Sequence, residues 1–418
     1  MRLLYTFALK CYALGIALWS CFHKKARLWH QGQQQVWKTL NPQLFENKEI
    51  IWFHCASLGE YEQGKPLMQR IKKEHPNAYL MLTFFSPSGF ETIQHEPLAD
   101  MVSYLPLDTP KNARRFIQIV KPKCAFFVKY EYWYNYMQEL NNQHIPLYYI
   151  SAIFRPNQYF FKFYGSWFVS QLRKVTHFFV QNEISVKLLN SIGIRQVMLT
   201  GDTRFDRVYA IANQAYSLEI VEQFQQDKKL LIVGSSWEQD EELLVKLYPR
   251  IAKDFKLVIA PHQIHEAHIQ QIKDLFSHYQ VVCYQSEELQ TDRAQALQQA
   301  DILIVDCIGL LSKIYKYSTI SYIGGAFKTG LHNTLEAAVF GVPLFFGPNY
   351  QKFDEAVTLV ALGGAFSINS AEEMYQILEG CYPPSEKYQQ VCDICKKFVA
   401  DNIGAAEKIL LKINPFLG

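Results

Sequence analysis

The sequence predicts an α/β protein built from two doubly wound parallel sheets in series. The chain has 418 residues, more than one hydrophobic core usually serves, which indicates two domains. Its 49% hydrophobic and 19% charged residues are typical of a folded, core-rich protein. Short apolar strand patterns alternate with helical patterns along most of the chain, and parallel strands need such crossover helices between them. The alternation therefore indicates open sheets with helices on both faces.

Charge and cysteine content narrow the classes of function. A formal net charge of +3 is too small to indicate a nucleic-acid-binding protein. Nine cysteines without a pairing pattern fit a reducing compartment. Cys392 and Cys395 lie three positions apart in a predicted helix, with no second pair or nearby histidine. We interpret them as structural residues and not as a metal or redox site.

The N-terminus differs from the rest of the chain. Residues 3–22 are apolar and aromatic apart from a few polar positions such as Lys10, and about 20 such residues can just span a bilayer. A basic cluster follows at once, formed by His23, Lys24, Lys25 and Arg27. Positive charge after the segment favours a cytoplasmic location for the remaining chain. The sequence predicts a membrane-anchoring segment over residues 1–30, either spanning the bilayer or lying flat in its interface. A helix docked on a partner and a plain core helix are the alternatives.

The predicted first domain covers residues 31–207. Its strands are expected at residues 49–54, 79–84, 102–105, 125–128, 147–150 and 178–180, with helices at 64–75, 110–120 and 185–191. A tight turn, Ser57-Leu58-Gly59-Glu60, follows the first strand. At the carboxyl end of a parallel strand, Glu60 would present a carboxylate to a ligand. The alternative is a helix N-terminal carboxylate that stabilises the helix dipole.

A second alternation follows a polar connecting helix predicted over residues 208–228. The second domain is expected over residues 229–384, with a helical tail over 385–418. Its strands are predicted at residues 230–233, 257–260, 281–283, 302–305, 320–323 and 344–346. Two open sheets in series, each with loops at its carboxyl edge, predict a ligand in the cleft between the domains.

The segment from Ile320 to Glu355 has the pattern of a ligand-binding βαβ unit. It runs from a strand through Gly324-Gly325 to a helix predicted over residues 334–340 and then to another strand. Asn333 occupies the expected N-cap position, where the helix N-terminus would attract an anion. Glu336 would face the same crevice and accept two ribose hydroxyls. The alternative is turn chemistry, with Glu336 as half of a capping arrangement.

Six strings occur in an order that is specific in combination. They are HCASLGEYEQGKPL, SPSGFE, YLPLD, EYWYN, TGDTRFD and GGAFKTGLHNTLEAAVFGVPLFFGPNYQKFDEA. In this order they resemble the 3-deoxy-D-manno-octulosonic acid (Kdo) transferases of lipopolysaccharide assembly, over roughly residues 50–366. The resemblance implies a GT-B glycosyltransferase, with two Rossmann-like domains facing a central cleft. It implies CMP-Kdo as the donor and a lipid A precursor, lipid IVA, as the acceptor at the cytoplasmic face of a Gram-negative inner membrane.

The resemblance also implies catalytic roles. Glycosyl transfer needs a base for the acceptor hydroxyl and positive groups for the departing phosphate. In the family the glutamate at the position of Glu60 is the base, and the positions of Glu131 and Arg204 stabilise the transition state. Arg204 stands where the family usually has lysine, which keeps the charge and changes the geometry. For Glu131 the alternative is a salt-bridged rim residue with Lys129 as partner.

The donor site implied by the resemblance lies in the second domain. Two departures from the family are His262, where many members have arginine, and Leu310, where the family has an acid. The implied CMP-Kdo-binding residues are Ser235, Ser236, Pro261, His262, Ile308, Gly309, Leu310, Gly325, Asn333, Thr334, Leu335 and Glu336. No metal and no cofactor beyond the donor substrate are expected. His262, His265 and His268 are the nearest approach to a metal set, but we interpret them as a solvated helix face with a phosphate contact.

An aromatic and basic strip in the first domain predicts a contact with lipid at the membrane surface. It comprises Arg155, Tyr159, Phe160, Phe161, Lys162 and Phe163. Packing beneath a crossover connection is the alternative for these residues.

Two other classes of function share parts of these patterns. Another membrane-associated nucleotide-sugar transferase, or a UDP-sugar epimerase, would have similar turns but would not be expected to have the Ser57-Leu58-Gly59-Glu60 turn. A non-catalytic nucleotide-binding module would tolerate the loss of Glu60.

Overall fold

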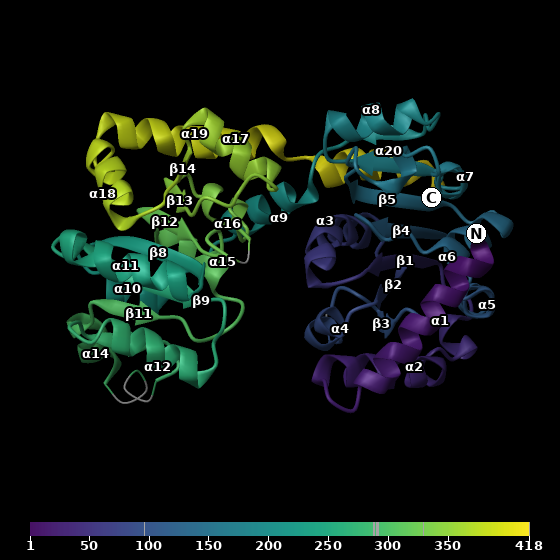
Figure 1. The fold of residues 1–418 in the computed structure, drawn as a ribbon, viewed down its shortest axis with the longest axis horizontal. Helices are drawn as coiled ribbons and strands as arrows, with labels where there is room; N and C mark the ends of the chain where they lie inside the picture. The colour runs from purple at the N-terminus through teal and green to yellow at the C-terminus, as the bar shows by residue number, and fades with distance from the viewer. Residues whose placement is uncertain (96, 287–288, 290–291, 329, 418) are drawn as a thin grey trace. The chain divides into compact units, whose positions relative to one another are not determined.

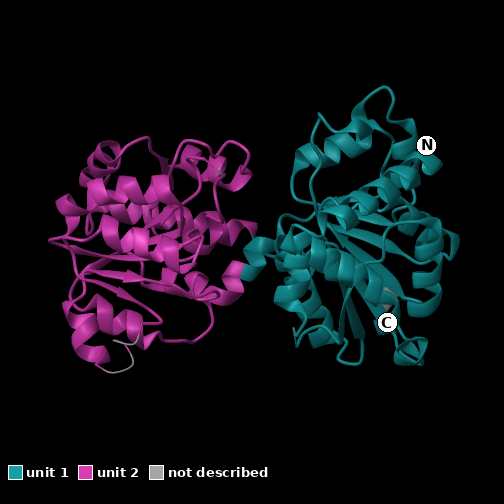
Figure 2. Cartoon of the chain, turned by 60° about the horizontal axis from the view of Figure 1, so that its bottom comes forward, with its two compact units in different colours: residues 1–207, 403–418 teal, residues 208–402 magenta. Residues whose placement is uncertain are grey.

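The protein folds into two compact units, which Figure 2 distinguishes by colour. The computed structural model describes residues 1–95, 97–286, 289, 292–328 and 330–417. Unit 1 comprises Met1–Arg207 and Ile403–Gly418, and unit 2 comprises Val208–Asn402. The chain thus leaves unit 1 once and returns to it at its C-terminus.

Unit 1 contains a sheet of seven parallel strands covered by helices (Figure 1). The strands are β1 (Ile50–Cys55), β2 (Tyr79–Phe84), β3 (Met101–Tyr104), β4 (Cys124–Val128), β5 (Leu147–Ala152), β6 (His177–Val180) and β7 (Val197–Leu199). The helices are α1 (Arg2–Trp19), α2 (Lys24–Thr39), η1 (Pro42–Phe45), α3 (Leu58–Glu74), α4 (Pro87–Ile93), α5 (Pro110–Val120), α6 (Tyr134–Asn142), η2 (Tyr159–Phe161), α7 (Ser166–Leu172), α8 (Glu183–Ser191), α9 (Thr203–Ala212), which runs on into unit 2, and α20 (Ala405–Leu417). The spatial order is β3-β2-β1-β4-β5-β6-β7, so the order reverses between β1 and β4. Such a reversal is where open α/β sheets bind ligands.

Unit 2 repeats this architecture with a second sheet of seven parallel strands. The strands are β8 (Lys229–Ser236), β9 (Phe255–Pro261), β10 (Val281–Cys283), β11 (Ile302–Ile304), β12 (Ile320–Ile323), β13 (Leu344–Phe346) and β14 (Ala365–Ser367). The helices are α10 (Glu219–Gln225), α11 (Glu238–Ile251), α12 (Glu266–Leu275), α14 (Arg293–Gln299), α15 (Leu311–Ile314), η3 (Tyr315–Tyr317), α16 (Leu335–Ala338), α17 (Asp354–Leu362), α18 (Ala371–Gly380) and α19 (Glu386–Asn402). The order β10-β11-β9-β8-β12-β13-β14 reverses between β8 and β12. The prediction of two parallel α/β domains is confirmed.

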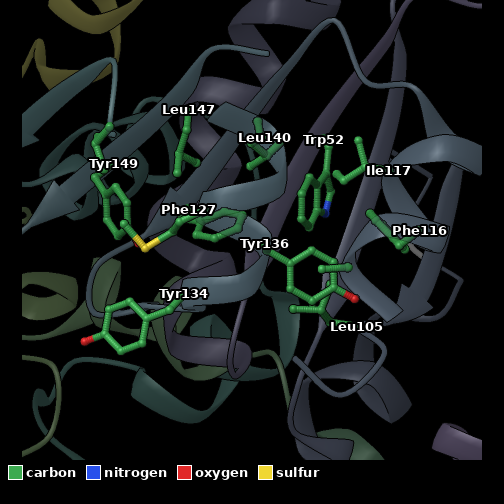
Figure 3. Packing of buried hydrophobic residues seen from close by; sticks show 14 of the residues in the cluster. Trp52, Leu105, Phe116, Ile117, Phe127, Tyr134, Tyr136, Leu140, Leu147 and Tyr149 are labelled. Atoms are coloured by element: carbon green, nitrogen blue, oxygen red, sulfur yellow. The ribbon is translucent and has the colours of Figure 1, made fainter. Parts of the chain in front are cut away.

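Strand β1 lies between β2 and β4 in the sheet of unit 1 and is buried along its whole length. Side chains alternate across a strand, so Trp52 enters one core and Phe53 enters the core on the other face. Trp52 packs against Phe116, Phe127 and Tyr136 with ring centroids 4.8 to 5.7 Å apart, and Figure 3 shows this cluster. A strand that is apolar on both faces is typical of a parallel sheet covered on both sides. For this reason β1 could be predicted correctly from the sequence.

The apolar N-terminus forms α1, followed by α2. In the part of the chain that the structure describes, no helix has both the length and the apolar character that a membrane span requires. The spanning alternative of the sequence analysis is therefore unsupported.

Helix α1 docks on unit 1 through its polar side chains. Arg2 Nε donates to Asn135 Oδ1 at 2.8 Å, and the Tyr5 hydroxyl donates to the buried Asp108 Oδ2 at 2.7 Å. Large apolar side chains of the same segment stay exposed, among them Leu3 (87%), Phe7, Leu14, Leu18, Trp19 and Phe22. One face of α1 is held by the unit and another presents apolar surface to its surroundings.

Three predicted helices differ from the observed ones. The connector over 208–228 is not one helix, because α9 ends at Ala212 and α10 begins at Glu219. The intervening backbone is held by tertiary contacts, such as the bond from Leu218 N–H to the Tyr317 hydroxyl, which local sequence cannot predict. The tail over 385–418 is likewise two helices, separated at Gly404, which has a φ of 96°.

The third difference affects the predicted ligand site. The helix expected over residues 334–340 is only the four-residue α16. Its first residue is Leu335, and Thr334 takes the N-cap position predicted for Asn333. So short a helix has little dipole of its own and adds little support to the anion site, which stays a prediction.

Candidate active site

Glu60 lies on the first turn of α3, directly after the turn that ends β1. Its Oε2 accepts the Ser57 N–H at 3.0 Å and contacts the Ser57 hydroxyl. The capping arrangement considered as the alternative is therefore present. The side chain is half-buried, and within the described residues its other oxygen, Oε1, makes no hydrogen bond. One oxygen orients the carboxylate and the second is available to a ligand.

Glu131 lies in the loop between β4 and α6, and its side chain is only 11% exposed. Oε2 lies 3.3 Å from His54 Nε2 and accepts the indole N–H of Trp133 at 2.7 Å. The hydroxyl of Tyr149 donates to the main-chain oxygen of Glu131 at 2.6 Å. His54, whose Nε2 lies beside Glu131 Oε2, is a residue to which the sequence analysis assigned no role.

The charges of both carboxylates affect the pKa of one thiol, that of Cys55. Burial is the main cause that raises the pKa of Cys55 well above its usual value, and the charges of Glu60 and Glu131 raise it further. Cys55 is the last residue of β1. Glu60 and Glu131 therefore converge on the carboxyl end of β1.

Arg204 lies on the first turn of α9, after β7. Its Nε and Nη2 contact Asp202 Oδ2 at 2.8 and 2.7 Å. Burial opposes ionisation of Asp202, but the charge and hydrogen bonds of Arg204 outweigh it and lower the pKa of that carboxyl. Asp202 also accepts from Gln63 Nε2 at 3.1 Å, and Gln63 follows Glu60 by one turn of α3. This link ties the Arg204 segment to the helix that carries Glu60.

The three predicted catalytic residues thus follow the carboxyl ends of β1, β4 and β7. These ends share one edge of a parallel sheet. Sequence reasoning missed His54, Gln63 and Asp202, which hold the three in position. A signal existed for His54 alone, because a histidine inside the apolar strand IIWFHC must find a buried partner.

In unit 2, some of the residues predicted to bind the donor substrate are accessible and others are buried. Ser235 is half-buried with a φ of 55°, and the exposed His262 follows Pro261 at the end of β9. Ser236 is fully buried and its hydroxyl donates to Glu241 Oε1 at 2.8 Å. Because its hydroxyl is used inside the unit, Ser236 can offer a ligand little beyond its backbone.

His262 lies in a stack of three rings. Its centroid is 4.6 Å from Trp237 and 4.6 Å from His332, with interplanar angles of 22° and 28°. Trp237 Nε1–H donates to His332 Nε2 at 3.2 Å, so that nitrogen carries no proton. Burial lowers the pKa of both histidines, and the neighbouring His262 helps to bring the pKa of His332 to about 4. At pH 7 the stack offers ring N–H groups and no full positive charge.

Asp240 ties this stack to the glycine turn after β12. It accepts the N–H groups of Trp237 and Gly325, each at 2.9 Å, and the Tyr322 hydroxyl at 2.7 Å. Gly325 has a φ of 92°, a conformation that favours glycine. Asp240 was not identified from the sequence. Its position on the first helical turn after β8 was a signal that could have indicated its role.

The remaining residues predicted to bind the donor substrate lie at the start of α16 and in the loop after β11. Asn333 Nδ2 donates to Glu336 Oε1 at 3.1 Å, and Asn333 Oδ1 accepts the Leu335 N–H at 3.2 Å. Thr334 and Leu335 are buried. The loop Ile308-Gly309-Leu310 includes Ile308 at 86% exposure and Gly309 with a φ of 94°. The loop after β11 is exposed and Glu336 at the start of α16 is half-buried. Both regions are therefore accessible from one edge of this sheet.

The interpretation of His262, His265 and His268 as a solvated helix face with a phosphate contact is wrong for one residue. His268 is only 4% exposed and lies 3.1 Å from Glu241 Oε1, so it is not part of a solvated helix face. The buried Glu241 attracts it inward, which local sequence could not indicate. Among the described residues, no group of three or more metal-ligating side chains is suitably arranged to hold a metal ion.

The aromatic-basic strip of unit 1 is divided in two. Phe160 is buried at 1% exposure, and the Tyr159 hydroxyl bonds the Tyr134 hydroxyl at 2.7 Å. Phe163 is 99% exposed and Tyr164 is 56% exposed. The packing alternative thus holds for Tyr159 and Phe160, and for the exposed Phe163 the lipid contact stays a prediction.

Comparisons with known proteins agree with the motifs. Residues 26–207 match the family model described as 3-deoxy-D-manno-octulosonic-acid transferase (kdotransferase). The chain is 25% identical over 383 residues to the 3-deoxy-D-manno-octulosonic acid transferase of Rickettsia typhi, covering 88% of this chain and 80% of the relative. It is also 25% identical over 384 residues to the enzyme of that name from Haemophilus influenzae, covering 88% and 87%. The resemblance inferred from the motifs is confirmed.

Solved structures show the same fold at low identity. A glycosyltransferase from Rickettsia africae has a TM-score of 0.58 with 12% identity, covering 89% of this chain and 99% of that one. A UDP-GlcNAc 2-epimerase from Neisseria meningitidis has a TM-score of 0.60 with 16% identity, covering 87% and 98%. At these identities the likeness concerns the fold alone.

Proposed function

Because the chain is similar to the Kdo transferase family over most of its length, we propose that it transfers Kdo from CMP-Kdo to a lipid A precursor such as lipid IVA. The observation that carries the proposal is the convergence of Glu60, Glu131 and the Arg204 segment on one edge of the unit 1 sheet. A carboxylate base with an adjacent acid and a guanidinium is the equipment that glycosyl transfer to a hydroxyl needs.

Glu60 is the proposed general base. Its Oε2 is occupied by the Ser57 N–H, which fixes the carboxylate plane. Oε1 then accepts the proton of the acceptor hydroxyl as the new glycosidic bond forms. A base held through one oxygen loses little freedom on binding its substrate, which favours transfer.

Glu131 and Arg204 are proposed to stabilise the transition state. Arg204 keeps its charge at every physiological pH, and its pairing with Asp202 holds the guanidinium in one orientation. Glu131 is held by His54 and Trp133. Charges fixed before the reaction need little reorganisation as the transition state forms.

The donor is proposed to bind at the carboxyl edge of the unit 2 sheet. Gly325 allows close approach of the backbone, and Glu336 is the acceptor for ribose hydroxyls. The ring N–H groups of His262 and His332 supply hydrogen bonds to phosphate, with the exposed Lys328, three residues after Gly325, as a source of full charge. CMP-Kdo is itself the activated donor, so the proposal requires no metal or cofactor.

The acceptor lipid gives the protein a proposed location at the cytoplasmic face of the inner membrane. The exposed apolar side chains of α1 are suited to the acyl boundary, and Lys24, Lys25 and Arg27 are suited to anionic headgroups. Phe163 and Tyr164 form a second exposed aromatic pair. We propose interfacial attachment through these two regions and no nucleic-acid partner.

The test is release of CMP from freshly prepared CMP-Kdo by the full-length protein, with and without lipid IVA. We expect release only with the lipid, and a product whose mass has increased by Kdo. Glu60→Gln should reduce transfer by a factor of about 100 to 10,000, the usual contribution of a general base, while CMP binding changes little. Glu74→Gln, at the other end of α3, is the matched control and should keep full transfer.

Two outcomes would reject the proposal. One is absence of CMP release with the lipid present, and the other is equal release of nucleotide from UDP-sugars. Turnover of a UDP-sugar without any acceptor would indicate the epimerase class, whose fold the chain shares. Full activity of Glu60→Gln would show that another group is the base.

A further inference from the structure

The N-terminal helix α1 contacts the start of α6, the helix that follows the Glu131 loop (Figure 1). Arg2 Nε donates to Asn135 Oδ1 at 2.8 Å, and Asn135 is fully buried. The ring of Tyr5 packs edge-on against that of Tyr134, with the ring centroids 4.9 Å apart. The first two turns of α1 thus contact residues that lie close behind Glu131 in the chain.

The N-terminus of α6 is capped by a residue from another loop. Within the described part of the chain, its own N-cap residue, Trp133, forms no side-chain capping bond. Asp108, which is 1% exposed, accepts the Asn135 N–H with Oδ2 at 3.1 Å and the Tyr136 N–H with Oδ1 at 3.0 Å. The Tyr5 hydroxyl donates to the same Oδ2 at 2.7 Å. Because a buried carboxylate is costly unless hydrogen bonds satisfy it, the hydroxyl from α1 stabilises this cap.

Trp133 connects the start of α6 to the candidate site. It immediately precedes α6, and its indole N–H lies 2.7 Å from Glu131 Oε2 and 2.8 Å from His54 Nε2. An indole N–H can only donate, so the placement of Trp133 determines where the carboxylate is stabilised. A displacement of the start of α6 would move this donor and the loop that carries Glu131.

The side of α1 that carries Tyr5 differs from the side that carries its exposed apolar residues. Tyr5 is two positions from both Leu3 and Phe7, and successive residues of a helix are about 100° apart around its axis. Leu3 and Phe7 are exposed, as are Leu14 and Leu18 at the same helical spacing. One side of α1 thus presents apolar surface while another contacts the segment that follows Glu131.

We propose that α1 is a structural part of the active site, with Tyr5 as a positioning residue that holds the Glu131 loop through Asp108 and the start of α6. Tyr5 contacts no reacting group and acts through these residues. The inference rests on the proposed function, because it gives a second role, in transfer, to the helix that is proposed to attach the protein to the membrane.

The experiment compares Tyr5→Phe with Tyr12→Phe in the full-length protein. Lipid IVA is supplied in detergent micelles, so that attachment to a bilayer is not needed. Tyr5→Phe keeps the ring against Tyr134 and removes the donor to Asp108. Tyr12→Phe is the matched control on the same helix, because within the described residues the hydroxyl of the 49% exposed Tyr12 makes no hydrogen bond.

We expect Tyr5→Phe to lower kcat about tenfold, since a misplacement of about 1 Å can cost about 100-fold and the shift here is smaller. The KM for CMP-Kdo should stay within about threefold, because the proposed donor site lies in unit 2. Tyr12→Phe should retain kcat within about threefold of the original protein. A kcat of Tyr5→Phe equal to that of Tyr12→Phe would overturn the inference.

Vesicle binding separates this role from membrane attachment. Tyr5→Phe leaves the exposed apolar side chains of α1 unchanged, so we expect it to sediment with vesicles of phosphatidylethanolamine and phosphatidylglycerol as the original protein does. A loss of kcat that is seen with vesicles and absent with micelles would overturn the inference, because it would be a defect of attachment.

Amide hydrogen exchange provides a measurement independent of activity. We expect the amides of Asn135 and Tyr136 to exchange about tenfold faster in Tyr5→Phe, and at the original rate in Tyr12→Phe. Unchanged exchange in Tyr5→Phe, or an increase spread evenly over unit 1, would overturn the inference. If no transfer from CMP-Kdo occurs, the proposed function fails, and the exchange measurement alone decides whether Tyr5 holds this segment.

Discussion

At the scale of single residues, the candidate site depends on side chains that other side chains hold. Glu60 is fixed by Ser57, Arg204 by Asp202, and Glu131 by His54. Each pairing uses part of the hydrogen-bonding capacity of the functional residue and fixes its orientation. Such support is the usual condition for accurate placement of reacting groups.

His332 gives a prediction about pH at this scale. Its folded-state pKa of about 4 lies below the ordinary value of 6.5, so the neutral ring is favoured in the folded protein. The stability that it contributes is present above pH 6.5 and is lost as the pH falls toward 4. We expect the difference in unfolding free energy between the original protein and His332→Gln to shrink by about 1 kcal/mol between pH 7.5 and pH 5, because the ring is partly exposed and solvent weakens the effect.

Chemical unfolding of both proteins at the two pH values measures this difference. A difference that does not change with pH would show that the ring takes up its proton equally in the folded and unfolded states.

At the scale of elements, the C-terminal helix α20 completes a hydrophobic core of unit 1. It begins after Gly404 and packs on α3, and its Ile409, Leu410 and Ile413 enter the same core as Phe53. Asp206 accepts the N–H groups of Gly404 and Ala406 at 2.6 and 2.9 Å. The last residue of the TGDTRFD string is thus a cap for the C-terminal helix, while Arg204 in the same string belongs to the candidate site.

Asp206 therefore gives a prediction about stability. Asp206→Ala removes the acceptor for two N–H groups at the start of α20, and should lower the unfolding free energy of unit 1 by about 1 to 2 kcal/mol. Urea unfolding followed by circular dichroism measures the change. Asp401→Ala is the control, because the contact that the described residues give Asp401 is an exposed pair with Lys397, one turn away. An equal effect of the two substitutions would contradict the capping role.

At the scale of the whole molecule, the two units differ in how the chain builds them. Unit 2 is formed by one continuous segment, Val208–Asn402, whereas unit 1 needs Met1–Arg207 and the returning segment from Ile403. Each unit has its own core, which is the usual condition for independent folding. A division of the chain after Arg207 alone would leave unit 1 without α20.

This difference predicts the behaviour of fragments. We expect residues 208–402 to unfold in one cooperative transition on their own. Residues 1–207 should melt at a lower temperature than the same segment joined by a short linker to residues 403–418, since three buried apolar side chains contribute about 1.5 to 3 kcal/mol each. Calorimetry of the three fragments measures these transitions. Equal melting temperatures for the two versions of unit 1 would show that α20 does not stabilise it.

The repeating strands of both sheets were predictable because their signal is local. Continuous apolar runs such as those of β1 and β4 mark strands buried on both faces. β7 and β14 were missed because each has three residues and is partly exposed, which is too little for a pattern. Likewise α16 was predicted too long, because its helical composition extends beyond the segment that the packing allows.

The sequence by itself determined the fold class, the family resemblance and the positions of Glu60 and Glu131 after their strands. Only the tertiary structure decided what holds these residues, and that His268 is buried. The reason is distance along the chain: Thr83 is 29 positions from His54, and Glu131 is 77 positions from it. Hydrophobic periodicity extends over a few turns of helix or residues of strand, whereas a hydrogen-bond partner is chosen by the packing of strands that are far apart in sequence.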